Sequence, residues 1–387
     1  MENRTENRTE NRIEKKLSQR LPVEELKISA ESCAGELCKS IGDYIGCTCK
    51  CLDICFPPPL YFSLHVACAL SIIMANHENE DWFYNHFVQV SFYHDYAEGN
   101  VHKYSIYPAM ETRTGQSAAS KFLNEVHVDR NVVNLKENSL INNIKIFIDN
   151  NYYVTCRVDV SQLNGTRYAG RSLCLHGIMI FGYDDRKKTL DILDFDDRQA
   201  INLIKISWGD FVSAFTSPDI PKYLGEKINN TIVLRKKKKA DYIFDLDVLK
   251  MALRDYLDSY NSSRRYSMIL PSDEKNTWGI STYGKIIEYL EENNQTLDMR
   301  LFQAFYEHKR VMYERFEYLK RKDIFYVEKE LLKVLKDNVQ EACTVKMMSL
   351  KYNMTGNLKV VERMMEKLKV IENKEKYSYE KILELMG

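Results

Sequence analysis

The residue pattern of this chain changes once, within the basic segment Arg235 to Asp241. Before this segment, short runs rich in β-branched and aromatic residues alternate with turn residues, which is typical of β-strands. After it, Lys, Glu, Leu and Met dominate and apolar residues recur at three- and four-residue steps, which predicts helices. The strand-like runs are FVQVSFYHDY, NNIKIFID, NYYVTCRVDV, CLHGIMIFGY and TLDILDF. The pattern predicts an α+β protein in which an antiparallel sheet comes first and a helical C-terminal region follows.

Composition divides the chain into three parts. The N-terminal stretch MENRTENRTENRIEKK repeats polar residues with a period of four and holds no apolar run of the kind found in signal peptides. We therefore expect residues 1–30 to form a flexible polar tail and the protein to be cytoplasmic. We expect one domain to span residues 31–238 and a helical domain to span residues 239–387.

Charge and hydropathy argue against two classes of partner. Lys plus Arg equals Asp plus Glu at 55 each, so the formal net charge is zero, and no overall field would draw the chain to nucleic acid. The most apolar segment, Leu60 to Ala75, is shorter than the roughly 20 residues that a membrane-spanning helix needs. Its apolar residues recur at helical spacing behind three prolines, which instead predicts a buried helix.

Ten cysteines are present, and six of them fall near the N-terminus: Cys33, Cys38, Cys47, Cys49, Cys51 and Cys55. A reducing cytosol disfavours disulfides. The run CTCKCLDIC could offer thiolates to Zn²⁺, but its spacing lacks the paired C-x2-C knuckles of common zinc ribbons. We therefore predict free thiols and no metal.

His176 and Asp194 stand at comparable positions in two neighbouring strand-like runs. Asp184 and Asp185, with the basic residues that follow, predict a turn, so the two runs should form an antiparallel hairpin. Asp185 lies midway between His176 and Asp194, which would bring the imidazole and the carboxylate side by side. A carboxylate there would keep one imidazole nitrogen protonated and leave the other as a base, as nucleophilic catalysis requires. From spacing alone, a histidine satisfied within its strand remains the alternative.

Two other reaction classes lack their usual motifs. The eight histidines show no H-E-x-x-H spacing, and the chain contains no G-x-x-x-x-G-K sequence. This argues against a metallohydrolase and against a nucleotide-dependent ligase. On the helical side, Glu307, His308 and Arg310 lie together on an expected helix, and we interpret them as a structural ion-pair set.

The segment LHGIMIFGYDD followed by LDILDF resembles the H-x5-G-Y-D…D segment of papain-like cysteine peptidases that process bacteriocin leaders, and of their relatives in antibiotic gene clusters. Downstream, Tyr283 to Leu319 resembles the D-x-R…EHK…M…R…YL helical signature of cysteine-peptidase-like proteins that accompany nonribosomal peptide and polyketide synthases. The butirosin acyltransferase family is related to these proteins. The resemblance, which runs from about Cys55 to Leu319, implies a papain-like domain with a central helix packed on an antiparallel sheet. It also implies that His176 is the general base and Asp194 its orienting carboxylate.

The resemblance further implies a nucleophilic cysteine at the start of the central helix, and none stands there. The expected position falls near Ser63 to His65. Three candidates remain open: Ser63 holds the position, Cys68 lies about one turn deeper, and Cys55 precedes the prolines. We expect Cys55 to complete the triad, because a thiol is the stronger nucleophile and a long central helix would begin at the prolines.

The function implied by the resemblance is acyl transfer in a thiotemplated antibiotic pathway. An acyl group would arrive as a thioester on the phosphopantetheine arm of an acyl or peptidyl carrier protein, pass to the enzyme and leave as an amide with a small amine acceptor. His176 would move the protons, and no further cofactor is expected. Two alternatives stay open: hydrolysis by a cysteine peptidase or thioesterase of the same fold, and a catalytically silent protein that binds a synthase.

Overall fold

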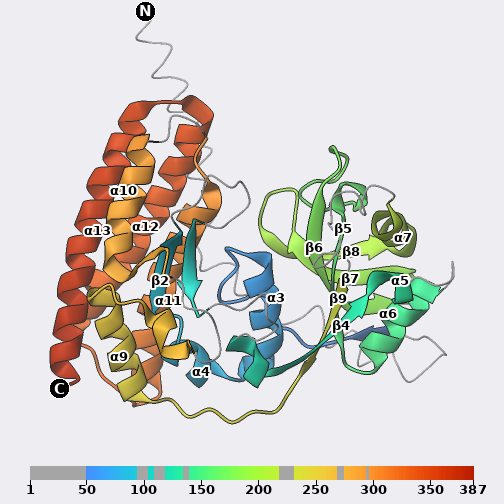
Figure 1. Ribbon diagram of the computed structural model, residues 1–387, viewed down its shortest axis with the longest axis horizontal. Coiled ribbons are helices and arrows are strands. Elements are labelled where there is room, and N and C mark those ends of the chain that lie inside the picture. Colours follow the sequence, from blue (N-terminus) through green and yellow to red (C-terminus); the bar gives the residue numbers. More distant parts are fainter. Residues whose placement is uncertain are drawn as a thin grey trace, which may run out of the picture.

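A computed structural model of the protein describes residues 49–93, 103–108, 118–133, 139–217, 231–267, 274–292 and 296–387. The expected tail, residues 1–30, and three of the clustered cysteines, Cys33, Cys38 and Cys47, lie outside the described residues. Figure 1 shows two lobes, one built on a sheet and one on long helices, with α3 (Leu64–Ile73) between them. The expected mixed α/β architecture with a helical C-terminal region is confirmed.

The sheet lobe is built on a seven-stranded antiparallel sheet. Its strands run in the order β4-β9-β5-β6-β7-β8, and β1 pairs with β6 outside this order. Their bounds are β1 Cys49–Cys51, β4 Leu123–Asp129, β5 Tyr153–Asp159, β6 Leu175–Asp184, β7 Thr189–Phe195, β8 Ile201–Ser207 and β9 Thr231–Lys237. Residues 177–183 of β6 are all buried, because α3 and α6 (Ser139–Asp149) pack against this strand. The core of the lobe is therefore centred on β6.

The run NNIKIFID is helical and belongs to α6, so the prediction of a strand there was wrong. Leu140, Ile144 and Ile148 recur at four-residue steps and are buried, whereas Ile146 is exposed. This spacing turns one apolar face toward the sheet. The four-residue spacing of apolar residues over the whole segment predicts the helix correctly, whereas the short alternation of isoleucine with other residues wrongly suggests a strand.

α3 begins later than expected. Its N-cap is Ser63, in extended backbone with φ −132° and ψ 135°, and the helix runs from Leu64 to Ile73. The expectation that the helix begins at Pro57 to Pro59 was therefore wrong. A residue that precedes proline disfavours helical backbone, which explains why the helix does not start within this segment.

A second, three-stranded antiparallel sheet belongs to the helical lobe. It consists of β10 (Asn276–Trp278), β2 (Gln89–Tyr93) and β3 (Tyr104–Tyr107), in that order. Its strands pack against α9, α10 and α11. Because β2 and β3 come from the expected domain 31–238 and β10 from the expected domain 239–387, the expected boundary at residue 238 does not separate the two lobes.

Five helices form most of the helical lobe: α9 Leu246–Leu257, α10 Thr282–Glu292, α11 Met299–Arg321, α12 Lys329–Thr355 and α13 Leu358–Leu385. α11 packs along α12, and α12 packs along α13. The other α-helices of the described residues are α4 Glu80–Asn85, α5 Arg130–Val133 and α7 Trp208–Thr216. Short 3₁₀ turns cover Ala75–His77, Ala118–Lys121, Val160–Gln162, Ser262–Tyr266 and Gly279–Ser281. Within the described ranges, none of these helices is both long enough and apolar enough to cross a bilayer.

Candidate active site

His176 and Asp194 form the pair that the expected hairpin suggested. Nδ1 of His176 lies 3.3 Å from Oδ1 of Asp194. The Asp194 side chain is only 3% exposed, whereas the His176 side chain is 35% exposed. The backbone N–H of Phe195 also donates to Oδ1 of Asp194, at 2.7 Å. The buried carboxylate is therefore held in place, while the imidazole beside it remains accessible to solvent.

A β-bulge decides which side chains of the β6–β7 hairpin share a face. The strand pairing shifts by one residue next to Gly182, so that Met179 is opposite Leu193. Because side chains alternate along a strand, Asp194 then lies on the same face as His176, as its diagonal neighbour. A shift of one residue moves side chains to the other face. Without this bulge, the carboxylate and the imidazole would point to opposite sides of the sheet.

Glycine is required at the bulge because β1 lies against it. A Cβ atom at Gly182 would lie 2.9 Å from the main-chain oxygen of Lys50 and 2.9 Å from Oδ2 of Asp191. No side chain fits at these distances without moving backbone. The G-Y-D segment of the sequence thus has a structural role in the register of the hairpin that carries His176.

Two aromatic rings flank the imidazole of His176. The ring centres of Tyr168 and Phe195 each lie 6.4 Å from the imidazole centre. Their planes are tilted from the imidazole plane by 54° and 60° respectively. Together with Asp194, these rings restrict the orientations that His176 can adopt.

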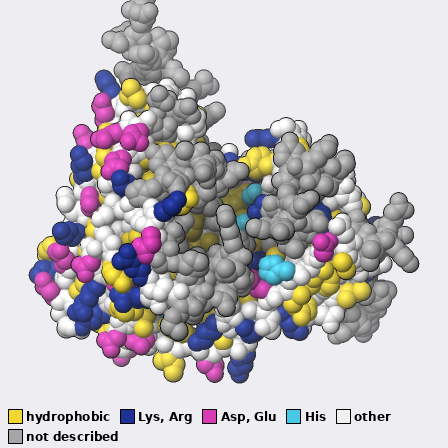
Figure 2. Space-filling model, in the orientation of Figure 1, with side chains coloured by type: hydrophobic (Ala, Val, Ile, Leu, Met, Phe, Trp, Pro, Cys, Tyr) yellow, Lys and Arg dark blue, Asp and Glu magenta, His cyan; other side chains and the backbone are white. Residues whose placement is uncertain are grey.

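The start of α3 lies against the strand that carries His176. A Cβ atom at the neighbouring Gly177 would lie 3.8 Å from Cδ2 of Leu64 and 3.9 Å from Cε1 of His65. Ser63 is the N-cap, but its side chain makes no capping hydrogen bond, and the residue is 8% exposed. The N-terminus of a helix favours negative charge. Figure 2 shows a hollow between the two lobes with histidine side chains on its wall.

Cys55 does not lie at this end of α3. Its backbone N–H donates to the main-chain oxygen of Ser71 at 2.8 Å, and Ser71 lies about 12 Å beyond Ser63 along the helix axis. Burial, followed by the nearby carboxylate of Glu80, raises the pKa of the Cys55 thiol, which disfavours the reactive thiolate. The structure does not bring the expected nucleophile to His176.

The second thiol candidate, Cys68, is buried in the core. A thiol in apolar surroundings behaves as a small hydrophobic side chain. A third thiol, Cys174, lies two residues before His176 on the same chain segment and was not considered from the sequence. Burial, followed by the carboxylate of Asp159, raises the pKa of the Cys174 thiol. Of the side chains weighed as nucleophiles, only Ser63 stands at the helix start.

Helix α11 holds the chain that leads to Ser63. The buried carboxylate of Glu307 accepts hydrogen bonds from the backbone N–H groups of Tyr61 and Phe62, at 2.8 and 3.0 Å through Oε2. Arg310 donates to the main-chain oxygen of Pro59. Glu307 was expected to belong to an ion-pair set, but its hydrogen bonds come from these two backbone amides and from the side-chain amide of Gln303. The helical lobe therefore fixes the backbone that leads into α3, between the two lobes.

Replacement of Glu307 by Ala is expected to lower the free energy of unfolding by about 2–4 kcal/mol, because it leaves two buried N–H donors without an acceptor. Chemical denaturation of the full chain measures this change. The matched control is Glu314→Ala, which removes a partly exposed carboxylate 3.2 Å from Arg310 on the same helix and should change the free energy by about 1 kcal/mol or less. Equal losses in the two variants would refute the anchoring role of Glu307.

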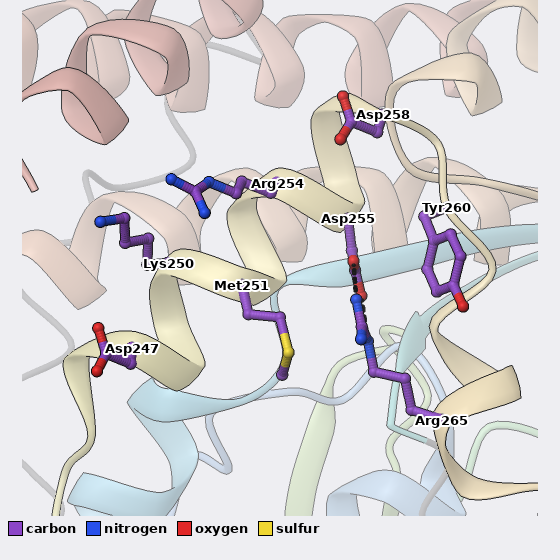
Figure 3. Close-up of a pocket in the computed structure, with 8 residues that line it drawn as sticks. All are labelled: Asp247, Lys250, Met251, Arg254, Asp255, Asp258, Tyr260 and Arg265. Carbon is purple, nitrogen blue, oxygen red and sulfur yellow. Dashed lines mark hydrogen bonds and ion pairs between the residues drawn. The ribbon is translucent and has the colours of Figure 1, made fainter. Parts of the chain in front are cut away.

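A separate hollow of 550 Å³ lies on the surface of the helical lobe (Figure 3). It is lined by Asp247, Lys250, Met251, Arg254, Asp255, Asp258, Tyr260 and Arg265. Arg265 and Asp255 form an ion pair across one side of it, as Figure 3 shows. Its lining mixes three acidic and three basic side chains and contains no histidine, serine or cysteine. We therefore regard the hollow between the lobes as the better candidate for chemistry.

Across the described residues, no group of three or more His, Cys, Asp or Glu side chains is arranged to hold a metal ion. Comparison with known proteins finds no matching family model and no curated protein that resembles the chain. Function must therefore be inferred from the candidate site itself.

Proposed function

We propose that the protein is a papain-like acyltransferase that forms an amide from a carrier-protein-bound acyl thioester and a small amine, in the cytoplasm, as part of antibiotic biosynthesis. The observation that carries this proposal is the contact between Nδ1 of His176 and the buried Asp194 carboxylate, on the strand against which the start of α3 packs. An imidazole held in this way can act as a general base through its other nitrogen.

We assign the nucleophile to Ser63 in place of Cys55. The Ser63 hydroxyl would attack the thioester carbonyl, and the C–S bond would break. His176 would take the hydroxyl proton and pass it to the departing thiolate. The amine would then attack the resulting ester, and His176 would move the amine proton to the Ser63 oxygen as the C–O bond breaks. A thioester is more reactive than an ester or an amide, so no nucleotide is required.

A serine in this position depends more strongly on its base than a thiol does, because its hydroxyl is rarely ionised. The buried Asp194 meets this need by holding Nδ1 of His176 as the proton-bearing nitrogen and by stabilising the imidazolium that forms. The helix N-terminus at Ser63 favours the negative charge that develops on the attacking oxygen. These features support acyl transfer from a serine in place of a cysteine.

Intact-mass measurement after incubation with an acyl carrier protein tests the assignment of Ser63. The wild-type chain should gain the mass of one acyl group, and added amine should release it as an amide. Ser63→Ala should show no adduct, whereas Cys55→Ala and Cys68→Ala should behave as the wild type does. An adduct that survives in Ser63→Ala would refute Ser63 as the nucleophile.

The same experiment separates the competing functions. Release of free acid in the presence of amine would indicate a thioesterase or peptidase, because water then replaces the amine. The absence of a thiol at the start of α3 also favours a catalytically silent synthase-binding protein as the second candidate. Stable binding to the carrier protein with neither adduct nor amide would support that candidate and overturn the acyltransferase proposal.

A further inference from the structure

Two arginines flank the tyrosine that lies next to His176. The guanidinium carbon of Arg167 lies 5.1 Å from the ring centre of Tyr168, and that of Arg171 lies 6.0 Å from it. The Tyr168 ring centre is 6.4 Å from the imidazole of His176. The segment between β5 and β6 therefore brings two positive charges to the edge of the candidate active site.

Hydrogen bonds anchor the backbone of this segment, which fixes the positions from which the two arginine side chains extend. The N–H of Arg167 donates to the main-chain oxygen of Phe195 at 2.9 Å, and the N–H of Arg171 donates to that of Tyr168 at 3.0 Å. The N–H of Gly170 donates to the main-chain oxygen of Ser161 at 2.8 Å. A backbone that is already ordered adds little conformational entropy cost when its side chains bind a ligand.

Neither arginine has a carboxylate partner among the described residues, and Nε of Arg167 is buried without any hydrogen-bond partner there. Three nearby carboxylates are engaged elsewhere. Asp196, which pairs with Thr166, accepts from Asn202 and from the N–H groups of Arg198 and Ala200. Asp159 accepts from Ser161, Gln162 and the N–H of Cys174, and Asp194 binds His176. A buried donor without an acceptor is costly and calls for an explanation.

Arg300, in contrast to Arg167 and Arg171, is already engaged by a carboxylate. Arg300, at the start of α11, binds the carboxylate of Asp298 at 2.8 Å through Nη2. Its hydrogen bonds to Asp298 raise the pKa of the Arg300 guanidinium. Arg167 and Arg171 are therefore the arginines available to a ligand next to Tyr168.

We propose that Arg167 and Arg171 bind an anionic group, a carboxylate or a phosphate, carried by the acyl donor or the amine acceptor that reacts at His176. The guanidinium fork matches the oxygens of either group. This inference deepens the proposed function and rests on it, because the bound anion is part of a substrate only if the protein is the proposed acyltransferase. The phosphodiester of the phosphopantetheine arm is at the far end of the arm from the thioester, so the anion belongs to a reacting molecule.

Calorimetric titration with inorganic phosphate and, separately, with butyrate tests the site. The wild type should bind at least one probe saturably, and the probe that binds identifies the anion. Arg167→Gln and Arg171→Gln should each weaken binding at least about tenfold, as expected when a charged hydrogen bond is lost. Arg171→Lys, which keeps the charge but not the fork, should weaken it less.

Arg363→Gln is the control, because Arg363 is an exposed residue of α13 and its loss changes the net charge equally; it should leave binding unchanged. Arg171 is exposed, so its variant should fold even where Arg167→Gln does not. Saturable binding to neither probe, or wild-type affinity in Arg171→Gln, would overturn the site. Anion binding without acyl transfer would refute the proposed function alone, and acyl transfer without anion binding would refute this inference alone.

Discussion

Replacement of His176 by Ala is expected to reduce the rate of acyl transfer by about 10²–10⁴-fold, the range that a general base contributes. The reason is that no other base contacts the buried Asp194 carboxylate in the proposed mechanism. Turnover of an acyl carrier protein thioester with an added amine, followed by mass spectrometry, measures the rate. Added imidazole should restore part of the activity, because it can occupy the space that the lost ring leaves.

Asp194→Asn should lower the same rate while leaving the fold intact, because the amide no longer holds the required tautomer of His176. The control is His127→Ala, which removes an exposed histidine from β4. This strand is at one edge of the sheet, and three strands separate it from β7. It should leave the rate unchanged. A His176→Ala variant that keeps more than about a tenth of the wild-type rate would remove the basis of the proposed mechanism.

Replacement of Glu375 by Leu is expected to lower the free energy of unfolding by about 3–5 kcal/mol, the cost of leaving a buried charge without its partner. Glu375 on α13 accepts from Nζ of Lys309 at 2.7 Å, in a pair with both side chains 1% exposed. It also accepts from the hydroxyls of Tyr256, Tyr283 and Tyr379 at 2.8, 2.7 and 2.7 Å. One carboxylate thus joins α9, α10, α11 and α13.

Chemical denaturation of three variants separates the contribution of the ion pair to stability from that of the tyrosine hydrogen bonds. The double variant Lys309→Met, Glu375→Leu should be more stable than Glu375→Leu alone, because no unpaired charge then remains buried. The control Lys367→Ala breaks a pair with Glu341 whose side chains are about one third exposed, and it should cost about 1 kcal/mol or less. A double variant as unstable as the single one would show that the tyrosine hydrogen bonds, and not the ion pair, dominate.

The contribution of Glu375 also has a defined pH dependence. Burial alone would raise the pKa of Glu375, but the Lys309 ammonium outweighs this effect, and the pKa lies below its ordinary value of 4.5. A lowered carboxyl pKa stabilises the folded state above the ordinary pKa, and this stabilisation is lost as the pH falls through the folded-state pKa. The stability difference between the wild type and Glu375→Leu should therefore narrow below pH 4.5.

The hairpin shows how far sequence reasoning reached. Turn residues at Asp184 and Asp185 predict the pairing of the two strands, and the pairing is confirmed. The contact between His176 and Asp194 was expected from the same reasoning, but the two residues are diagonal neighbours. Asp184 pairs with Thr189, so the turn is not centred on Asp185, and the bulge next to Gly182 then brings the two side chains to one face. A bulge depends on the approach of another strand, here β1, which no local pattern indicates.

The nucleophile shows where sequence reasoning failed. Cys55 has suitable chemistry and precedes a helix, but its N–H binds Ser71 near the opposite end of that helix. The direction of the chain before α3 is set by Glu307, which lies more than 240 residues away in sequence from Phe62. Contacts over such a separation leave no periodic signal, so sequence spacing could not exclude Cys55.

The sequence by itself determined the hairpin, the buried helix behind the prolines and the helical C-terminal region, because each follows from the period of apolar residues and from turn chemistry over short distances. Only the tertiary structure decided which lobe holds β2 and β3 and which side chain stands at the start of α3. It also decided that Arg167 and Arg171 lie against the ring of Tyr168, which in turn lies next to His176. The physical reason is that these features depend on packing between distant segments, where buried hydrogen bonds and steric fit select one arrangement among many that satisfy the same local pattern.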